Sequence, residues 1–431
     1  MTGLRAGGFP EAAIRARAVH GEAAVFPPVD DYGRRVFGAD PAARPADAVD
    51  RARLVPPVFV PMRLEKLIDL GREPLFADVD LTTEIGGFTA PLPAFLSAFG
   101  STRLGSTTHA VAASRQAGRL GIPMVVGENV VPVNGYDRGA DAADNVLLTR
   151  VRAYSADLPD GLGGVVVQQS TEDADAEVWN LVYSDPSVEP LLATGRLGFE
   201  LKVGQGAKPG LGGMTVVDAA AADRLSDRYA VHDVFGGGRV LRSATPGTFT
   251  DEILRQQIRL MRNNFPRARV WVKLPPGRDV ADAARVAWAA GADAVTVDGA
   301  EGGSGWAPTA FLDQVGLPLG ECLRRIGTPD GCLLAGGRMW EGGRLVRTLA
   351  LGARAVAVGR AALIAVDEDP EQGLCRLVSA LALETAMLIS ALGKYTPAAV
   401  DRADLWAPEL DPSPSAALPC PPTGSNEAVE R

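Results

Sequence analysis

The sequence predicts a (β/α)8 barrel, in which eight parallel strands form a closed ring and helices cover its outside. From residue 91 on, short apolar runs that end in glycine or a polar residue alternate with helical stretches. Eight such runs occur, which is the number that closes this type of barrel. No run is followed by the GxGxxG turn and later acidic residue that mark dinucleotide-binding open sheets, so the open doubly wound sheet is the less favoured alternative.

The predicted strands are short apolar runs, in chain order 91–98, 121–127, 164–169, 198–203, 269–274, 293–297, 332–337 and 354–359. Amphipathic helical patterns follow the first, fifth and seventh runs, at 109–120, 279–291 and 342–352. Strands that alternate with helices form βαβ units and a parallel sheet.

Three segments lie outside this alternation. Residues 1–85 form an N-terminal extension rich in proline, arginine and aspartate, in which 56–70 reads as an extended segment leading into a short helix. The barrel is predicted over 86–408, and 409–431 has the Pro/Ser-rich composition of a disordered tail. The interval 204–268 is too long for a simple connection, and long loops after barrel strands lie on the catalytic face.

Composition excludes several classes of protein. A net charge of −9 leaves no basic excess for binding nucleic acid. The four cysteines show no CxxC spacing, which argues against a disulfide framework or a zinc site. The apolar stretch 374–392 carries Arg376 and Glu384, so we do not expect it to span a membrane, and the N-terminus lacks the apolar region of a secretion signal. We therefore expect a cytoplasmic protein, and a homo-oligomer.

Glycines cluster after the last three predicted strands, and two of the clusters continue into arginine. The clusters are Gly302-Gly303, Gly336-Gly337-Arg338 and Gly359-Arg360. In barrels, phosphate commonly binds at the loops after strands seven and eight, where bare NH groups and a helix N-terminus face the anion. Any single one of these glycines could simply end a strand and allow a positive φ. The common register of the three clusters and the two arginines favour a phosphate site instead.

Lysine is rare in this chain, since only five of the 43 basic residues are lysines and 38 are arginines. Such a chain keeps lysine where a guanidinium group cannot replace it. Lys202 and Lys273 lie on predicted strands among apolar neighbours, and Lys208 lies in the loop that follows Lys202. We predict functional roles for these three lysines and interpret Lys66 and Lys394 as surface residues.

Other polar groups also end predicted strands. Glu128 follows the second run, and Gln168 and Gln169 close the third. A carboxylate on the inner rim acts as an acid or base, or forms a structural ion pair, and the pattern leaves both roles open. No Ser-His pair and no HExxH motif is present, so hydrolytic triads and metal-dependent hydrolysis lose their support.

The run GFELKVGQGAKPGLGG at 198–213 resembles the FMN-binding synthase domain of glutamate synthase, whose signature is a strand reading EIK followed by GQGAKPGEGG. Segments of this chain correspond to that domain in the same order: LSAFGST, VVGENV, VVVQQS, WVKL, VDGAEGGSGWAP, LLAGGR and VAVGRAAL. The resemblance covers about residues 85–408 and implies a barrel of the FMN-binding type.

The resemblance also implies roles for individual residues. The isoalloxazine ring would lie against Ala98, Phe99, Gly100 and Ser101, with Gln168 and Lys273 at its pyrimidine side. The phosphate would be held by Gly303, Gly337, Arg338, Gly359 and Arg360. The carboxylate and the oxo or imino group of a 2-oxoglutarate-like substrate would meet Lys202, Gln205 and Lys208, with Glu128 nearby for proton transfer.

The chain departs from the family pattern in several places. The family has three closely spaced cysteines after its last strand, whereas this chain offers only Cys375, so we expect no iron–sulfur cluster. No amidotransferase segment precedes the barrel, so we do not expect this chain to make ammonia. VLRSATPGTFT replaces the family's SPPPHHDIYS, STEDADAEVW replaces its RFG segment, and Leu211 replaces the glutamate of GEGG. These changes bear on the substrate more than on the cofactor.

The resemblance implies an FMN-dependent oxidoreductase acting on amino acids and 2-oxo or imino acids, by glutamate-linked amination or amine transfer through an imine. In the preferred version, an amino acid such as glutamate reduces the flavin and an imine reoxidises it, as in the related N-methylglutamate synthase type. The other version takes electrons from a separate donor protein, and either version leaves room for a separate amine-donor protein. The alternatives are a non-redox FMN barrel enzyme and a scaffold subunit of a multi-subunit synthase.

Overall fold

The structure is a computed structural model. It describes residues 4–7, 9–21, 47–99, 107–127, 146–170, 178–206, 210–220, 226, 229–232, 239–303, 311 and 314–410.

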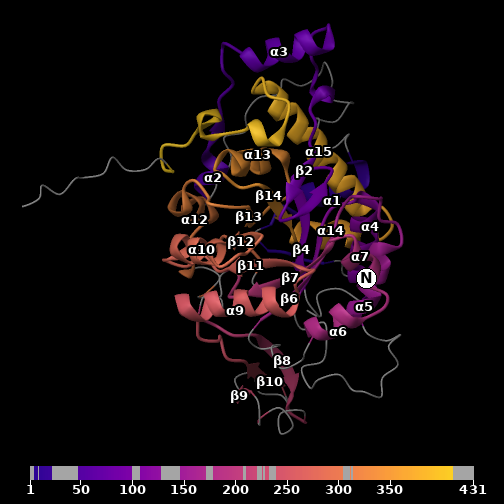
Figure 1. The fold of residues 1–431 in the computed structure, drawn as a ribbon, viewed down its shortest axis with the longest axis vertical. Coiled ribbons are helices and arrows are strands. Elements are labelled where there is room, and N and C mark those ends of the chain that lie inside the picture. The colour runs from indigo at the N-terminus through magenta and orange to yellow at the C-terminus, as the bar shows by residue number, and fades with distance from the viewer. Residues whose placement is uncertain are drawn as a thin grey trace, which may run out of the picture.

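Eight parallel strands close into a barrel at the centre of the molecule (Figure 1). The strands are β4 (Ala94–Phe99), β5 (Met124–Val126), β6 (Val165–Gln169), β7 (Leu197–Lys202), β11 (Arg269–Leu274), β12 (Ala294–Asp298), β13 (Leu333–Gly336) and β14 (Ala355–Val358). Each pairs with the next, and β14 pairs with β4 to close the ring. Each lies within three residues of a predicted run, which confirms the predicted fold class. The runs are continuously apolar because the strands are buried on both faces.

Helices pack around the outside of the barrel (Figure 1). They are α4 (Thr107–Leu120), α5 (Val146–Ser155), α6 (Val178–Ser184), α7 (Glu189–Ala193), α9 (Asp251–Asn264), α10 (Val280–Ala289), α12 (Leu319–Ile326), α13 (Gly342–Ala350) and α14 (Arg360–Glu368). The three helices predicted from amphipathic patterns correspond to α4, α10 and α13. Helix α9 begins after Thr250, whose hydroxyl accepts a hydrogen bond from the Ile253 amide at 3.1 Å and so satisfies one amide of the first turn.

A β-hairpin closes the N-terminal end of the barrel. It consists of β2 (Thr83–Ile85) and β3 (Phe88–Ala90), joined by Gly86 and Gly87, which both have positive φ. Indole Nε1 of Trp271 donates to the Gly86 carbonyl at 3.0 Å. The hairpin and the lower strand residues form a second apolar core inside the barrel, separate from the larger core between strands and helices.

Described parts of the N-terminal extension lie against the helices outside the barrel and against β15 (Leu405–Trp406). Helix α1 (Glu11–His20) packs on α14, α2 (Ala48–Arg51) packs on α12 and α13, and β1 (Arg53–Leu54) pairs with β15. Helix α3 (Pro61–Leu70), with η3 (Phe76–Asp78) after it, lies at one end of the molecule (Figure 1). The predicted boundary at residue 85 falls inside the β2–β3 hairpin, and the domain limits stay a prediction.

The last long helix, α15 (Gly373–Ala391), is long and apolar enough to cross a membrane. Half of its apolar window is buried, it packs on α1, α13 and α14, and Glu384 pairs with Arg17 of α1 at 2.7 Å. It therefore serves as a core helix of this fold. Two short turns follow, η6 (Pro397–Ala399) and η7 (Arg402–Asp404). Of the predicted tail, Glu409 and Leu410 are described, and 411–431 lie outside the described residues.

The long interval after β7 contains a small antiparallel sheet, which the sequence did not predict. Strands β8 (Met214–Asp218), β10 (Arg239–Ser243) and β9 (Ala230–His232) lie in that order, at the end of the molecule opposite α3 (Figure 1). The insertion leaves the barrel at the C-terminal end of β7 and returns through α9 to β11.

Candidate functional site

The barrel interior changes from apolar to polar toward the C-terminal ends of its strands, here called the C-terminal rim. Alternate residues of a strand share a face, so each polar side chain lies two residues beyond an apolar one. The pairs are Val166 and Gln168, Trp271 and Lys273, and Ala294 and Thr296. All three polar residues are at most 5% exposed, so the polar side chains form a buried layer above the apolar core.

The members of this layer bind one another. Nζ of Lys273 lies 3.0 Å from a carboxylate oxygen of Asp298. Glu200 accepts a hydrogen bond from the Thr296 hydroxyl at 3.1 Å and another from the Gln168 amide nitrogen. Burial raises the pKa of Glu200 above its ordinary value, and the positive charge of Lys273 opposes that rise. The layer thus places a cation next to two carboxylates, one of them favoured toward its protonated form.

A second lysine lies beside the first at the C-terminal rim. Lys202 ends β7 and is the register partner of Lys273 on β11, and it is 8% exposed. Residues in register on parallel strands point to the same side of the sheet, so Lys202 also belongs to the interior face. Two cations on neighbouring strands form a site suited to an anionic ligand. The structure confirms the burial that the sequence predicted for both lysines.

The arginines after β13 and β14 converge on the N-terminus of α14. Arg338 has a φ of 55° and is the one residue other than glycine with positive φ in the described part of the chain. Burial lowers the pKa of Arg360, and the nearby charge of Arg338 lowers it further. Helix α14 starts after Gly359 with no side chain capping its first amides. Two cations and uncapped helix amides at one place are groups that can bind a phosphate, and the phosphate site stays a prediction.

Three buried polar atoms near the C-terminal rim have no hydrogen-bond partner among the described residues. They are the hydroxyl of Ser170 after β6, Nε of Arg338 after β13, and Nη2 of Arg150 on α5. Buried polar groups in folded proteins nearly always have partners. Their position beside the rim is the one expected for a ligand site.

The predicted flavin wall at the end of β4 has a buried arginine behind it. Arg150 donates through Nη1 to the Phe99 carbonyl at 3.0 Å, and its guanidinium carbon lies 5.0 Å from the centroid of the Phe99 ring. Arg150 is fully buried, which lowers its pKa to about 10. Ala98 and Phe99 end β4, and their contact with a flavin stays a prediction, whereas Gly100 and Ser101 lie outside the described residues.

The remaining predicted site residues lie in loops, and only some of them are described. Gln205 lies in the loop after β7, and a Cβ on the adjacent Gly206 would lie 3.1 Å from the Gly302 carbonyl, so the loops after β7 and β12 meet. Gly303 is exposed, and a Cβ there would meet nothing within 4 Å. Glu128 and Lys208 lie outside the described residues, so their roles stay predictions.

The sequence did not single out Glu200, Thr296 or Arg150. Two of them carried a usable signal, since Glu200 lies two residues before Lys202 and Thr296 two residues before Asp298. That spacing puts each pair on one strand face. Arg150 has no such signal, because an arginine in a helical pattern is normally interpreted as exposed.

Three cysteines are described, Cys322 on α12, Cys332 before β13 and Cys375 on α15, and all three are free. Among the described residues, no group of three or more His, Cys, Asp or Glu side chains could hold a metal ion. The expectation that the chain lacks an iron–sulfur cluster stays a prediction.

Solved structures share the fold at low sequence identity. The (S)-mandelate dehydrogenase from Pseudomonas putida has a TM-score of 0.55 and 17% identity, covering 93% of this chain and 100% of that one. Flavocytochrome b2 with bound sulfite has a TM-score of 0.56 and 16% identity, and the match covers 89% of this chain and 84% of that one. A mandelate oxidase with an FMN adduct has a TM-score of 0.51 and 19% identity, and the match covers 83% of this chain and 88% of that one. The fold is thus a (β/α)8 barrel of the type found in FMN-dependent enzymes.

Curated relatives match at higher identity over a shorter length. A glutamate synthase large subunit-like protein of Rhizobium meliloti is 35% identical over 183 residues, which is 40% of each chain. An archaeal-type glutamate synthase [NADPH] of Dehalococcoides mccartyi is 32% identical over 184 residues, 41% of this chain and 36% of that protein. The match thus spans well under half the length of these relatives. Residues 161–375, about half of the chain, match the model of the conserved region in glutamate synthase. Through this domain, the chain belongs to the glutamate synthase family.

Proposed function

We propose that this protein is an FMN-dependent oxidoreductase that acts on the C–N bond of amino acids and 2-imino acids, with glutamate or a related acid as one substrate. The observation that carries the proposal is the pair of buried lysines, Lys202 and Lys273, in register at the C-terminal rim of a glutamate synthase-type barrel. Both lie in a chain in which 38 of the 43 Lys and Arg residues are arginine.

The residues at the rim fit FMN. Arg338, Arg360 and the open amides of α14 supply a cationic, hydrogen-bonding place for a phosphate. A Cβ on Gly359 would lie 3.3 Å from Cβ of Ser97, so glycine leaves the backbone at this turn room to approach β4 closely. Gln168 and Lys273, both buried at the C-terminal rim, would supply polar groups to the flavin ring. Phe99, backed by Arg150, offers an aromatic wall.

FMN, when bound, accepts a hydride equivalent from a substrate and returns one to another. The chain's own residues bind and orient the substrate and control its protons. Lys202 would bind the α-carboxylate, and Gln205 and Lys208 are the further proposed substrate contacts. Glu128 is the proposed group for proton transfer. The buried layer below excludes water and keeps Lys273 positioned through Asp298.

The deciding experiment is a visible absorption spectrum of the purified protein, followed by anaerobic addition of amino acids one at a time. Flavin absorption that bleaches with glutamate supports the redox-balanced cycle, in which no separate electron donor is needed. Flavin that stays oxidised with every amino acid contradicts that cycle and favours a donor protein or the non-redox alternative. A colourless protein that FMN cannot reconstitute contradicts the proposal and favours a scaffold.

A single substitution separates the substrate site from the flavin site. Lys208→Ala should weaken the binding of an acidic substrate and leave the bound flavin in place, because Lys208 is assigned to the substrate alone. Loss of flavin from this variant would show that the assignment is wrong. The cytoplasmic location, the homo-oligomer and the separate amine-donor or electron-donor protein stay predictions.

A further inference from the structure

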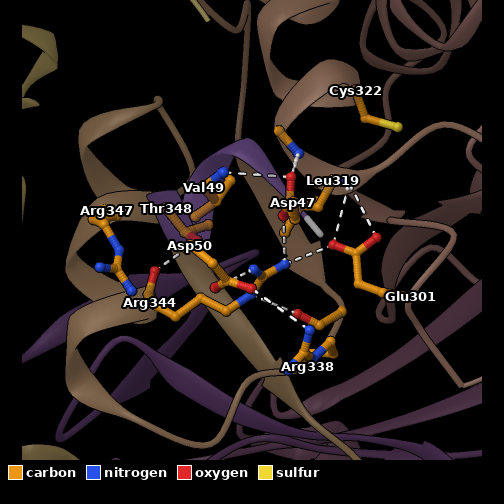
Figure 2. A network of polar contacts seen from close by, with 12 residues as sticks. Asp47, Val49, Asp50, Glu301, Leu319, Cys322, Arg338, Arg344, Arg347 and Thr348 are labelled. Carbon is orange, nitrogen blue, oxygen red and sulfur yellow. Dashed lines mark hydrogen bonds and ion pairs between the residues drawn. The ribbon is translucent and has the colours of Figure 1, made fainter. Parts of the chain in front are cut away.

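Arg344 on α13 is the centre of a polar network beside the proposed phosphate site (Figure 2). Its side chain is 1% exposed. Nη2 donates to Asp47 at 2.8 Å and to Glu301 at 2.6 Å, and Nη1 donates to Asp50 at 2.5 Å. Nε donates to the carbonyl of Gly337 at 2.9 Å. A buried guanidinium needs such complete pairing, so Arg344 is held in one orientation by four partners.

Two of the partners come from the N-terminal extension. Asp47 caps α2, accepts a hydrogen bond from the Val49 amide at 3.3 Å, and accepts another from the Gly320 amide at 3.2 Å. Asp50 lies one turn further along and also lies 3.7 Å from Nη1 of Arg338. The extension therefore reaches α12, α13 and the turn after β13 through two carboxylates.

The remaining contacts join the loops that follow the last three strands. Glu301, after β12, accepts hydrogen bonds from the Leu319 amide at 3.2 Å and fixes the start of α12. Arg360, after β14, donates to the Glu301 carbonyl. Gly337 and Arg338, after β13, meet Arg344 and Asp50. All three loops of the proposed phosphate site are thus connected to one buried arginine.

We propose that Asp50, with Asp47, is a positioning residue for the cofactor phosphate: through Arg344 and Arg338 it fixes the loops after β12, β13 and β14 in the arrangement that binds the anion. The inference rests on the proposed FMN binding and assigns a role to the N-terminal extension. Charge alone predicts the opposite result, because removal of a carboxylate near an anion site strengthens anion binding. Positioning dominates, since Arg344 is 1% exposed, its three carboxylate partners are at most 16% exposed, and each contact is a direct hydrogen bond or ion pair.

The test compares FMN with riboflavin, which lacks the phosphate, by flavin fluorescence titration of the apoprotein. Asp50→Asn should weaken FMN binding about tenfold or more and leave the riboflavin Kd within about twofold. Riboflavin binding also shows that the variant is folded. An unchanged or tighter FMN Kd in Asp50→Asn overturns the inference.

A matched control comes from the same edge of the protein. Glu409 pairs with Arg51 of α2 at the surface, so Glu409→Gln removes one negative charge without touching Arg344. It should leave the preference for FMN over riboflavin unchanged, and a loss equal to that of Asp50→Asn would overturn a specific role for Asp50. If Asp50→Asn does not fold, Asp50→Glu keeps the charge but displaces it, and it should show the same FMN-specific weakening.

The two hypotheses fail in different ways. Native protein that binds neither flavin overturns the proposed function and this inference with it. Native protein that prefers FMN, together with an Asp50→Asn variant that keeps the full preference, overturns the positioning role alone.

Discussion

The two ends of the barrel interior are built from the same strands and differ in chemistry. At the N-terminal end, Trp271 packs with Phe88 and Phe95 at ring-centroid distances of 5.6 and 5.8 Å and hydrogen-bonds the hairpin. At the C-terminal rim, two residues further along the same strand, Lys273 pairs with Asp298. One end of the barrel interior therefore contributes apolar packing and the other a buried charged layer, two residues apart on the same strand.

Trp271→Ala is expected to have the largest effect on stability. It removes a fully buried indole and its hydrogen bond to Gly86, which should cost about 4 kcal/mol of unfolding free energy. Denaturant unfolding followed by circular dichroism measures this loss. Trp271→Phe keeps most of the apolar contact and should lose less. Equal losses in the two variants would contradict a packing role for the indole.

Lys273→Met tests the opposite end of the same strand. It leaves Asp298 and Glu200 without the buried cation, which should lower stability by about 3 kcal/mol and weaken flavin binding. Denaturant unfolding and flavin titration measure the two effects. Lys66→Met, on the partly exposed helix α3, is the matched control and should stay within about 0.5 kcal/mol of the parent. Stability of Lys273→Met equal to that of the control would show that the C-terminal rim contributes no structural ion pair.

Glu301→Gln should change how stability depends on pH. Burial first, and then the charge of Asp47, raises the pKa of Glu301 from 4.5 to about 7. Between these values the folded chain binds more protons than the unfolded chain, so the free energy of unfolding falls as the pH rises. The fall attributable to Glu301 should be about 2 kcal/mol between pH 5 and pH 7. Unfolding curves at both pH values measure it, and an equally steep fall in the variant would contradict the assignment.

Lys202→Met is expected to have the smallest effect, and on substrate rather than on stability. It should raise KM for an acidic substrate about tenfold, equivalent to about 1.4 kcal/mol, because one cation of the pair is lost. Steady-state kinetics against Lys66→Met provide the comparison. An unchanged KM would contradict the assignment of the carboxylate site to Lys202 on β7.

The sequence predicted the barrel because its signal is local. Each strand is a separate apolar run. A parallel strand buried on both faces is continuously apolar, so it can be recognised from its own residues alone. The burial of Lys202 and Lys273 could be predicted for the same reason, since their neighbours in the sequence are apolar. The Arg344 network could not, because two of its three carboxylates, Asp47 and Asp50, lie almost 300 residues from the arginine and nothing local marks them as partners. The β8–β10–β9 sheet was missed because its short strands lie among glycines and polar residues that read as loop.

The separation of Asp47 and Asp50 from Arg344, 297 and 294 residues along the chain, has a consequence for biosynthesis. Asp47 and Asp50 are synthesised before Arg344, and at about 5–20 residues per second the arginine follows roughly 15 to 60 s later. The network therefore forms only on a nascent chain that extends past residue 344 and has β12 and β13 in place. A chain that terminates before residue 344 carries Asp47 and Asp50 without the arginine that pairs with both of them.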